Sequence, residues 1–222
     1  RAILQNSEME NYGYISAYET VNWASASDMS LVKSGYGDRN SDTGYVTDLL
    51  ATVENGGTMY YRLSVSNTSG NSSVTDVSMV DILPAKGDYR VGNTASRASE
   101  WQLYLGEIGA VSKVGTAGET STIDSSLYKV YYYTGMTADY SEYQNVYEDA
   151  KTLKFETSAL PEGWTDARPS DAKSVRAIAV AFSDEVTLAS NESLTVEYTA
   201  RVNGGEPYDT AELSENAYKN AV

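Results

Sequence analysis

Apolar and polar side chains alternate along several segments of this chain. In 194–202 the apolar side chains share one face and Thr, Glu and Arg share the other, and 58–66 shows the same period of two. Such alternation is typical of a β-strand with one buried face. Further apolar or alternating runs predict strands at 29–34, 74–82, 101–105, 128–133 and 175–182.

Turn-forming residues flank these segments: Asn55-Gly56-Gly57 stands before 58–66, and Asn203-Gly204-Gly205 stands after 194–202. Many short strands with one polar face each predict an all-β chain, folded as an antiparallel sandwich of immunoglobulin type. A long helical period is absent from the sequence, and only 143–153 predicts a short helix, on a loop.

The pattern also divides the chain. Residues 28–222 carry the predicted Ig-like sandwich, with a long mid-chain insertion at about 106–163 that we expect to hold extra strands. Residues 1–27 combine an N-terminal strand, at 12–21, with a linker, at 22–27. That strand belongs either to a preceding module or to the sheet of this domain, and the sequence leaves both readings open.

The amino-acid composition excludes most kinds of catalytic site. The 222 residues include no His and no Cys, which excludes Ser-His-Asp and Cys-His nucleophiles, zinc sites built on those ligands, thiol redox chemistry and disulfides. We expect no cofactor and no metal. The net charge of −15 argues against nucleic acid and anionic membrane as partners, and the sequence contains no run of 18 apolar residues that would span a bilayer. Exported proteins of Gram-positive bacteria often lack Cys, which favours an extracellular location.

Three polar residues fall where the period of two predicts an apolar side chain. Lys33 continues the face of Met29 and Leu31, Asp81 continues the face of Val77 and Met79, and Asn220 shares the phase of its flanking apolar residues. Burial of any one of them alone would be unfavourable. The alternative interpretation places each at a strand end, where it reaches solvent.

Several stretches resemble the Ig-like modules of Gram-positive surface proteins and pilins, of the collagen-adhesin A-type fold and its tandem wall-repeat relatives. The resemblance covers about residues 29–222 in order. It rests on Leu31-Val32-Lys33-Ser34, Tyr60-Tyr61-Arg62-Leu63-Ser64-Val65-Ser66-Asn67, Val80-Asp81-Ile82-Leu83-Pro84, Ser174-Val175-Arg176-Ala177-Ile178, Glu192-Ser193-Leu194-Thr195-Val196 and Asn220-Ala221-Val222.

In such modules a Lys on the first strand joins an Asn on the last through an intramolecular isopeptide bond, beside an acidic residue. The resemblance therefore implies Lys33 and Asn220 as the bonded pair and Asp81 as the acid that promotes the reaction. Burial favours the uncharged, nucleophilic amine and the protonated acid that this reaction requires. Asn216 shares the phase of Asn220 and is the alternative partner, whereas Asp76 lies on the opposite face from Asp81.

The sequence thus favours a non-enzymatic structural or adhesin module of a bacterial cell-surface or cell-wall protein, whose partners are neighbouring modules of the same protein. At most it performs one self-crosslinking turnover. The alternative is a module that binds a glycan or a host protein through the Tyr-rich insertion, with Tyr131, Tyr133 and Trp164 as stacking residues. Buried rings there would favour the structural function, and exposed rings the binding function.

Overall fold

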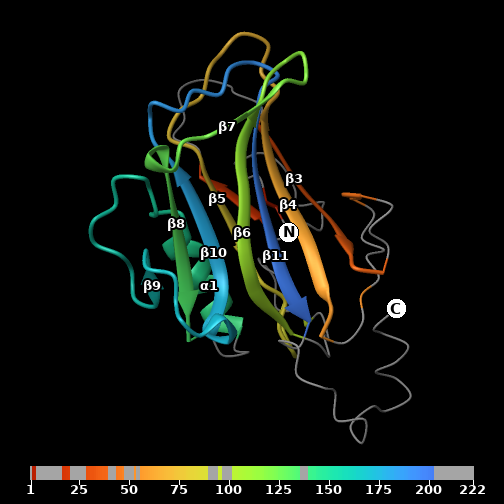
Figure 1. Ribbon diagram of the computed structural model, residues 1–222. Coiled ribbons are helices and arrows are strands. Elements are labelled where there is room, and N and C mark those ends of the chain that lie inside the picture. Colours follow the sequence, from red (N-terminus) through yellow and green to blue (C-terminus); the bar gives the residue numbers. More distant parts are fainter. Residues whose placement is uncertain are drawn as a thin grey trace, which may run out of the picture.

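The computed structural model describes residues 2–3, 17–20, 29–39, 44–47, 53, 56–89, 95–96, 102–135 and 140–202. These residues form two β-sheets that pack face to face (Figure 1). One sheet has the order β1 (Ala2–Ile3), β2 (Ala17–Thr20), β5 (Ser78–Ile82), β10 (Val175–Phe182), β8 (Tyr128–Thr134), β9 (Trp164–Thr165). The other has the order β3 (Met29–Gly37), β4 (Thr58–Asn67), β11 (Ser193–Val202), β6 (Leu103–Val114), β7 (Thr120–Thr122).

Neighbouring strands run antiparallel, apart from the parallel pair β1–β2. The structure confirms the predicted all-β antiparallel sandwich. One α-helix, α1 (Tyr140–Ala150), and the 3-10 turns η2 (Ser125–Leu127) and η3 (Ala172–Ser174) complete the described elements. None of the helices among the described residues is long and apolar enough to cross a membrane.

Alternation located most strands well, but two of them differ from the prediction. β5 starts later than expected because Asp76 has a left-handed backbone, with φ 56°, that interrupts an extended strand; Val74 forms only an isolated bridge to Leu188. β6 continues to Val114, far beyond the predicted 101–105. Its ladder with β11 contains two register shifts, and these bulges hide the period of two in the sequence.

The segment 106–163 does carry strands, and it supplies them to both sheets. Most of β6 and all of β7 and β8 lie within it; β6 pairs with β11 in one sheet and β8 pairs with β10 in the other. The predicted helix is α1, which begins and ends earlier than 143–153. At the N-terminus, β2, which is the described part of the predicted strand 12–21, pairs antiparallel with β5.

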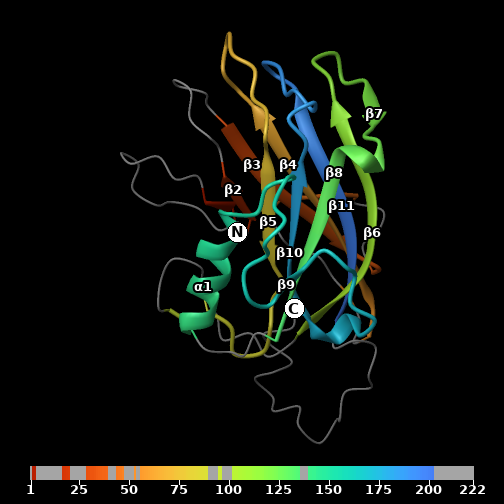
Figure 2. The ribbon, with the colours of Figure 1, turned by 90° about the vertical axis from the view of Figure 1, so that its left-hand side faces the viewer.

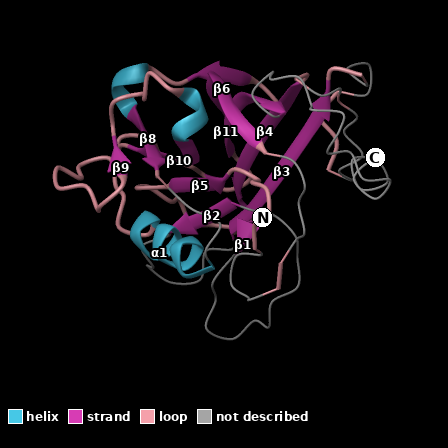
Figure 3. Cartoon of the chain, turned by 90° about the horizontal axis from the view of Figure 1, so that it is seen from below, coloured by secondary structure: helices cyan, strands magenta, loops and turns pink. Residues whose placement is uncertain are grey.

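The apolar side chains form two cores. The larger core lies between the sheets and includes Leu63, Val65 and Val196 from one sheet and Met79 and Ile178 from the other. The smaller core lies on the outer face of the six-stranded sheet, and α1 covers part of that face (Figures 2 and 3). This arrangement explains why every residue of β10 is buried, whereas burial alternates along β4.

Candidate functional site

Lys33 and Asp81 meet in the core between the two sheets. Lys33 projects inward from β3, in the phase of Met29 and Leu31, and Asp81 projects inward from β5, in the phase of Met79. Lys33 Nζ lies 2.6 Å from Asp81 Oδ2, and the two side chains are 9% and 0% exposed. Strand parity therefore directs both groups into the interior, and the packing of the sheets brings them into contact.

Two tyrosines of the five-stranded sheet enclose this pair. Tyr198, on β11, donates a hydrogen bond from its hydroxyl to Asp81 Oδ2, the same oxygen that contacts Lys33. Tyr61, the cross-strand partner of Tyr198 on β4, presents its ring face to Lys33 Nζ at 4.3 Å from the ring centroid. The two rings stack with centroids 5.1 Å apart. The ammonium group is thus held by a carboxylate on one side and a π-face on the other.

A glycine on β3 makes room for this arrangement. Gly35 is one inward position beyond Lys33 and pairs with Tyr61 across the ladder. A Cβ atom at Gly35 would lie 2.8 Å from Tyr60 O and 3.1 Å from the Tyr61 ring. The ring of Tyr61 can therefore lie flat across β3 toward Lys33 only because residue 35 has no side chain.

The second carboxylate oxygen of Asp81 lacks a hydrogen-bond donor among the described residues. Oδ1 is buried and has no hydrogen-bond partner among the described residues, while Oδ2 receives both Lys33 and Tyr198. Buried carboxylate oxygens are nearly always hydrogen-bonded, because leaving one unpaired costs roughly 1–3 kcal/mol or more. The cluster of Lys33, Asp81, Tyr61 and Tyr198 therefore has one acceptor position left for a further group.

Tyr198 is held in its protonated form. Complete burial, the charge of Asp81, the neighbouring Tyr61 and the hydrogen bond to Asp81 together raise the pKa of Tyr198 well above 10.0. Its hydroxyl is consequently a hydrogen-bond donor throughout the physiological pH range and cannot serve as a base there.

Of the other residues considered for the bond, the structure describes Asp76 but not the two asparagines. Asn220 and Asn216 lie outside the described residues, so the structure places neither of them relative to Lys33. Asp76 lies before the start of β5 and makes a different contact, in which its Oδ2 is 3.0 Å from Lys154 Nζ. Of the two aspartates, Asp81 is the one beside Lys33.

The aromatic residues of the insertion are mostly packed inside. Tyr131 is 0% exposed and donates its hydroxyl to Lys154 O at 2.8 Å, and Trp164 is 6% exposed. Both belong to the smaller core, and Tyr133 is half-buried with its ring 5.4 Å from that of Trp164. The expectation of a stacking surface is therefore corrected for Tyr131 and Trp164, because both rings are buried in the smaller core.

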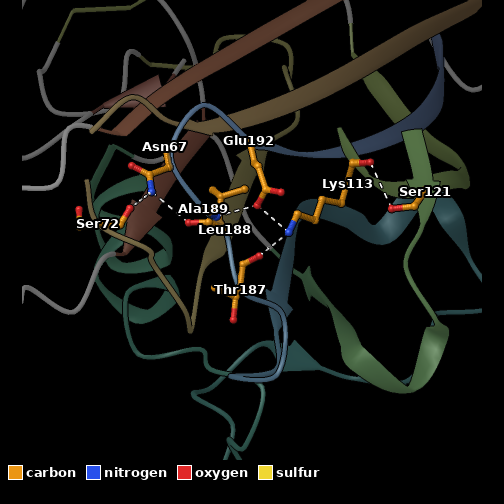
Figure 4. A network of polar contacts seen from close by, with 8 residues as sticks. All are labelled: Asn67, Ser72, Lys113, Ser121, Thr187, Leu188, Ala189 and Glu192. Atoms are coloured by element: carbon orange, nitrogen blue, oxygen red, sulfur yellow. Dashed lines mark hydrogen bonds and ion pairs between the residues drawn. The ribbon is translucent and has the colours of Figure 1, made fainter. Parts of the chain in front are cut away.

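A second polar network joins the loops at one end of the sandwich (Figure 4). Lys113 Nζ, on β6, lies 2.6 Å from Glu192 Oε2 and donates to Thr187 O at 2.8 Å. Glu192 Oε2 also accepts from the backbone N–H of Ala189, at 2.7 Å. Asn67, fully buried at the end of β4, donates to Ser72 O and Leu188 O. These bonds fasten the loop 187–192 to both neighbouring strands.

Sequence reasoning placed Lys33 and Asp81 on inward faces but gave no role to Tyr198 and Tyr61. The same alternation had put both tyrosines on apolar faces, and their hydroxyls were the available signal. A buried hydroxyl needs a partner, and the buried carboxylate needs donors. Within the described part of the chain, no group of three or more Asp and Glu side chains lies close enough to hold a metal ion.

Comparison with known proteins identifies no family. No protein-family model and no curated protein matches the chain. Among solved structures the chain is similar to the "CBM3a-L domain with flanking linkers from scaffoldin cipA of cellulosome of Clostridium thermocellum". The TM-score is 0.33 and the identity 11%, over 80% of this chain and 71% of that one. A likeness this distant carries no argument about function.

Proposed function

We propose that this chain is a self-crosslinking structural module of a bacterial cell-surface protein, in which an isopeptide bond joins Lys33 to Asn220. The observation that supports this proposal is the buried contact between Lys33 Nζ and Asp81 Oδ2, at 2.6 Å, beside an Asp81 Oδ1 without a partner among the described residues. Burying a lone Lys–Asp pair seldom stabilises a fold, because desolvation offsets the attraction between the charges. A chemical role explains why the pair is there.

The reaction needs only groups of this chain. The Lys33 ammonium passes one proton to the Asp81 carboxylate, which leaves a neutral amine and a neutral acid. Asp81 then donates a hydrogen bond to the side-chain oxygen of Asn220 and polarises the carboxamide. Lys33 Nζ attacks Asn220 Cγ, the Cγ–Nδ2 bond breaks, and Nδ2 leaves as ammonia after taking one proton from the amine. The proton taken up by Asp81 at the start remains on its carboxyl group.

The edge of β3 is the place where a closing strand would bring the asparagine. In the described part of the chain β3 is the outermost strand of its sheet. Gly35 exchanges two backbone hydrogen bonds with Val46, at 3.0 and 3.2 Å, so its N–H and C=O point away from β4. Backbone groups alternate between the two sides of an antiparallel strand, so those of Lys33 and Leu31 point to the same outer side.

In the proposal, residues 216–222 pair along this edge with Asn220 inward. Asn216 has the same phase but lies four residues earlier, which is about 13 Å along an extended strand. Only one of the two asparagines can therefore reach Lys33. The module would act as a segment of an extracellular stalk or adhesin, linked to neighbouring modules of the same surface protein, and the cross-link would let it resist pulling from both ends.

Intact mass tests this function directly. The wild-type protein should weigh one ammonia less than its sequence mass, and Asp81→Ala and Asn220→Ala should each restore the missing mass. Two matched variants serve as controls. Asp76→Ala removes an aspartate that contacts Lys154, and Lys113→Ala removes a lysine that pairs with Glu192; both should keep the loss. An unmodified wild-type mass would overturn the proposal, whereas a loss that survives N220A but not Asn216→Ala would make Asn216 the partner.

A further inference from the structure

We propose that Tyr198 is a positioning residue of the cross-linking reaction, which binds Asp81 Oδ2 so that the reactive proton is held on Oδ1 and directed at the asparagine amide. This inference rests on the proposed function. It assigns a role to a side chain outside the Lys, Asp and Asn that take part in bond formation.

The two carboxylate oxygens of Asp81 have different surroundings, and the inference rests on that difference. Oδ2 receives the Tyr198 hydroxyl and lies 2.6 Å from Lys33 Nζ, whereas Oδ1 has no partner among the described residues. When the carboxylate takes a proton, one oxygen becomes a hydroxyl and the other a carbonyl, and a carbonyl oxygen is the better acceptor. The proton from Lys33 arrives at Oδ2, the oxygen that Lys33 contacts, and must then exchange to Oδ1; a permanent donor on Oδ2 favours this final form, with the carbonyl at Oδ2 and the hydroxyl at Oδ1.

Tyr198 suits this role because its strand and ring are packed on several sides and its hydroxyl keeps its proton. It lies in β11, which is paired on both sides, by β4 and β6, and its ring stacks on Tyr61. Complete burial is the largest cause that raises its pKa well above 10.0, and this cause does not depend on the charge that Asp81 loses when it takes a proton. Tyr198 thus fixes the direction of the carboxyl group without exchanging protons with it.

The strands around Asp81 contribute few groups that could replace Tyr198. In the two strands that flank β5, Asp81 pairs with Ile178 of β10 and Ala17 of β2, neither of which titrates. The titratable groups that face Asp81 in the cluster all come from the opposite sheet: Lys33 of β3, Tyr61 of β4 and Tyr198 of β11. Of these, Tyr61 offers Lys33 its ring face.

The rate of bond formation in the full chain tests the inference. Chains synthesised in a cell-free system and quenched in guanidinium chloride at successive times give the cross-linked fraction by intact mass, and protease resistance of parallel samples gives the folded fraction. Tyr198→Phe should slow the loss of ammonia on the order of 10- to 100-fold, as expected when a reacting group is misplaced. A folded, unreacted species should accumulate in Y198F and not in the wild type.

Tyr131→Phe is the matched control. Tyr131 is fully buried like Tyr198 and its hydroxyl makes one hydrogen bond, but to Lys154 O in the other core. Y131F should therefore lose comparable stability and form the bond at the wild-type rate. Refolding from guanidinium chloride at different pH values adds a readout that structural damage does not move. The dependence of the rate on pH should change in Y198F, because Tyr198 no longer sets which Asp81 oxygen carries the proton, and it should stay as in the wild type in Y131F.

Each outcome separates the two proposals. Wild-type protein of unmodified mass defeats the proposed function itself. Mass loss in the wild type together with equal rates in Y198F and Y131F, whether both fast or both slow, overturns the role of Tyr198 alone. Should Y198F not fold, NMR of ring-labelled wild-type protein decides: a slowly exchanging Tyr198 hydroxyl proton supports the inference, and a freely exchanging one refutes it.

Discussion

Two lysine–carboxylate pairs in this protein have the same Nζ–O separation, 2.6 Å, in different surroundings. Lys113 and Glu192 lie among loops at one end of the sandwich, with 26% and 18% of their side chains exposed, and each has a further backbone partner, Thr187 O and Ala189 N (Figure 4). Lys33 and Asp81 lie between the sheets, and one carboxylate oxygen has no partner among the described residues.

The two pairs differ in exposure and in the number of hydrogen-bond partners around the carboxylate. The Lys113–Glu192 network holds a loop in place, and partial exposure to water keeps its desolvation cost low. The Lys33–Asp81 pair is almost fully buried, so both charges are largely desolvated, and Asp81 Oδ1 has no partner among the described residues. A buried pair of this kind adds little net stability, which is consistent with the chemical role proposed for it.

The largest effect should follow loss of Lys33. Lys33→Ala removes the proposed nucleophile, and loss of the proposed cross-link alone should lower the free energy of unfolding by about 4–5 kcal/mol in the entropy model for loops of this length. The unpaired Asp81 carboxylate adds roughly 3–5 kcal/mol. Thermal melting of K33A beside N220A separates the two contributions, since N220A keeps the ion pair. Equal melting temperatures for K33A and the wild type would contradict the cross-link.

Loss of Lys113 should be milder. Lys113→Ala removes the ion pair with Glu192 and the bond to Thr187 O, both of which water can partly replace. We expect about 1–2 kcal/mol of destabilisation in urea unfolding, with the wild-type mass. A loss as large as that of K33A would show that the two networks do not differ as described.

Alkaline pH should act on the buried cluster. The pKa of Tyr198 is raised in the folded state, so above pH 10 the unfolded chain loses a proton that the folded chain keeps. Stability is therefore fully present below about pH 10 and falls above it, by up to about 1.4 kcal/mol per pH unit from this residue. Urea unfolding at pH 9 and 11 should show a smaller decline for Y198F than for the wild type, compared in the same cross-linked state, because only the wild type keeps the Tyr198 hydroxyl; identical declines would count against the raised pKa.

Acid pH should act on the loop network, with the smallest effect. Although desolvation opposes the shift, hydrogen bonds from Lys113 and from Ala189 N–H lower the pKa of Glu192 below 4.5. This contribution is present above about pH 4.5 and is lost as the pH falls through the lower folded-state value. Because solvent screens the pair, we expect less than about 1 kcal/mol. Glu192→Gln should remove this part of the acid sensitivity, and an unchanged acid profile for E192Q would disprove its origin.

The alternation of apolar and polar residues predicted strand bounds well where only one face of a strand is buried. Alternation located β4 and β11 nearly to the residue and gave the inward phase of Lys33 and Asp81, because side-chain direction in a strand depends only on parity. It was weaker for β6, where two bulges shift the phase, and for β5, which Asp76 interrupts.

By itself the sequence determined the fold class, most strands, the lack of His and Cys chemistry and the strand phase of a lysine and an aspartate, for which burial and exposure at a strand end both remained open. The tertiary structure decided that these two side chains touch, that Tyr198 occupies Asp81 Oδ2, and that Tyr131 and Trp164 lie in the smaller core. The reason is physical. Parity is set by neighbouring residues, whereas contact across two sheets or under a helix depends on which distant strands pair, and no local period encodes that pairing.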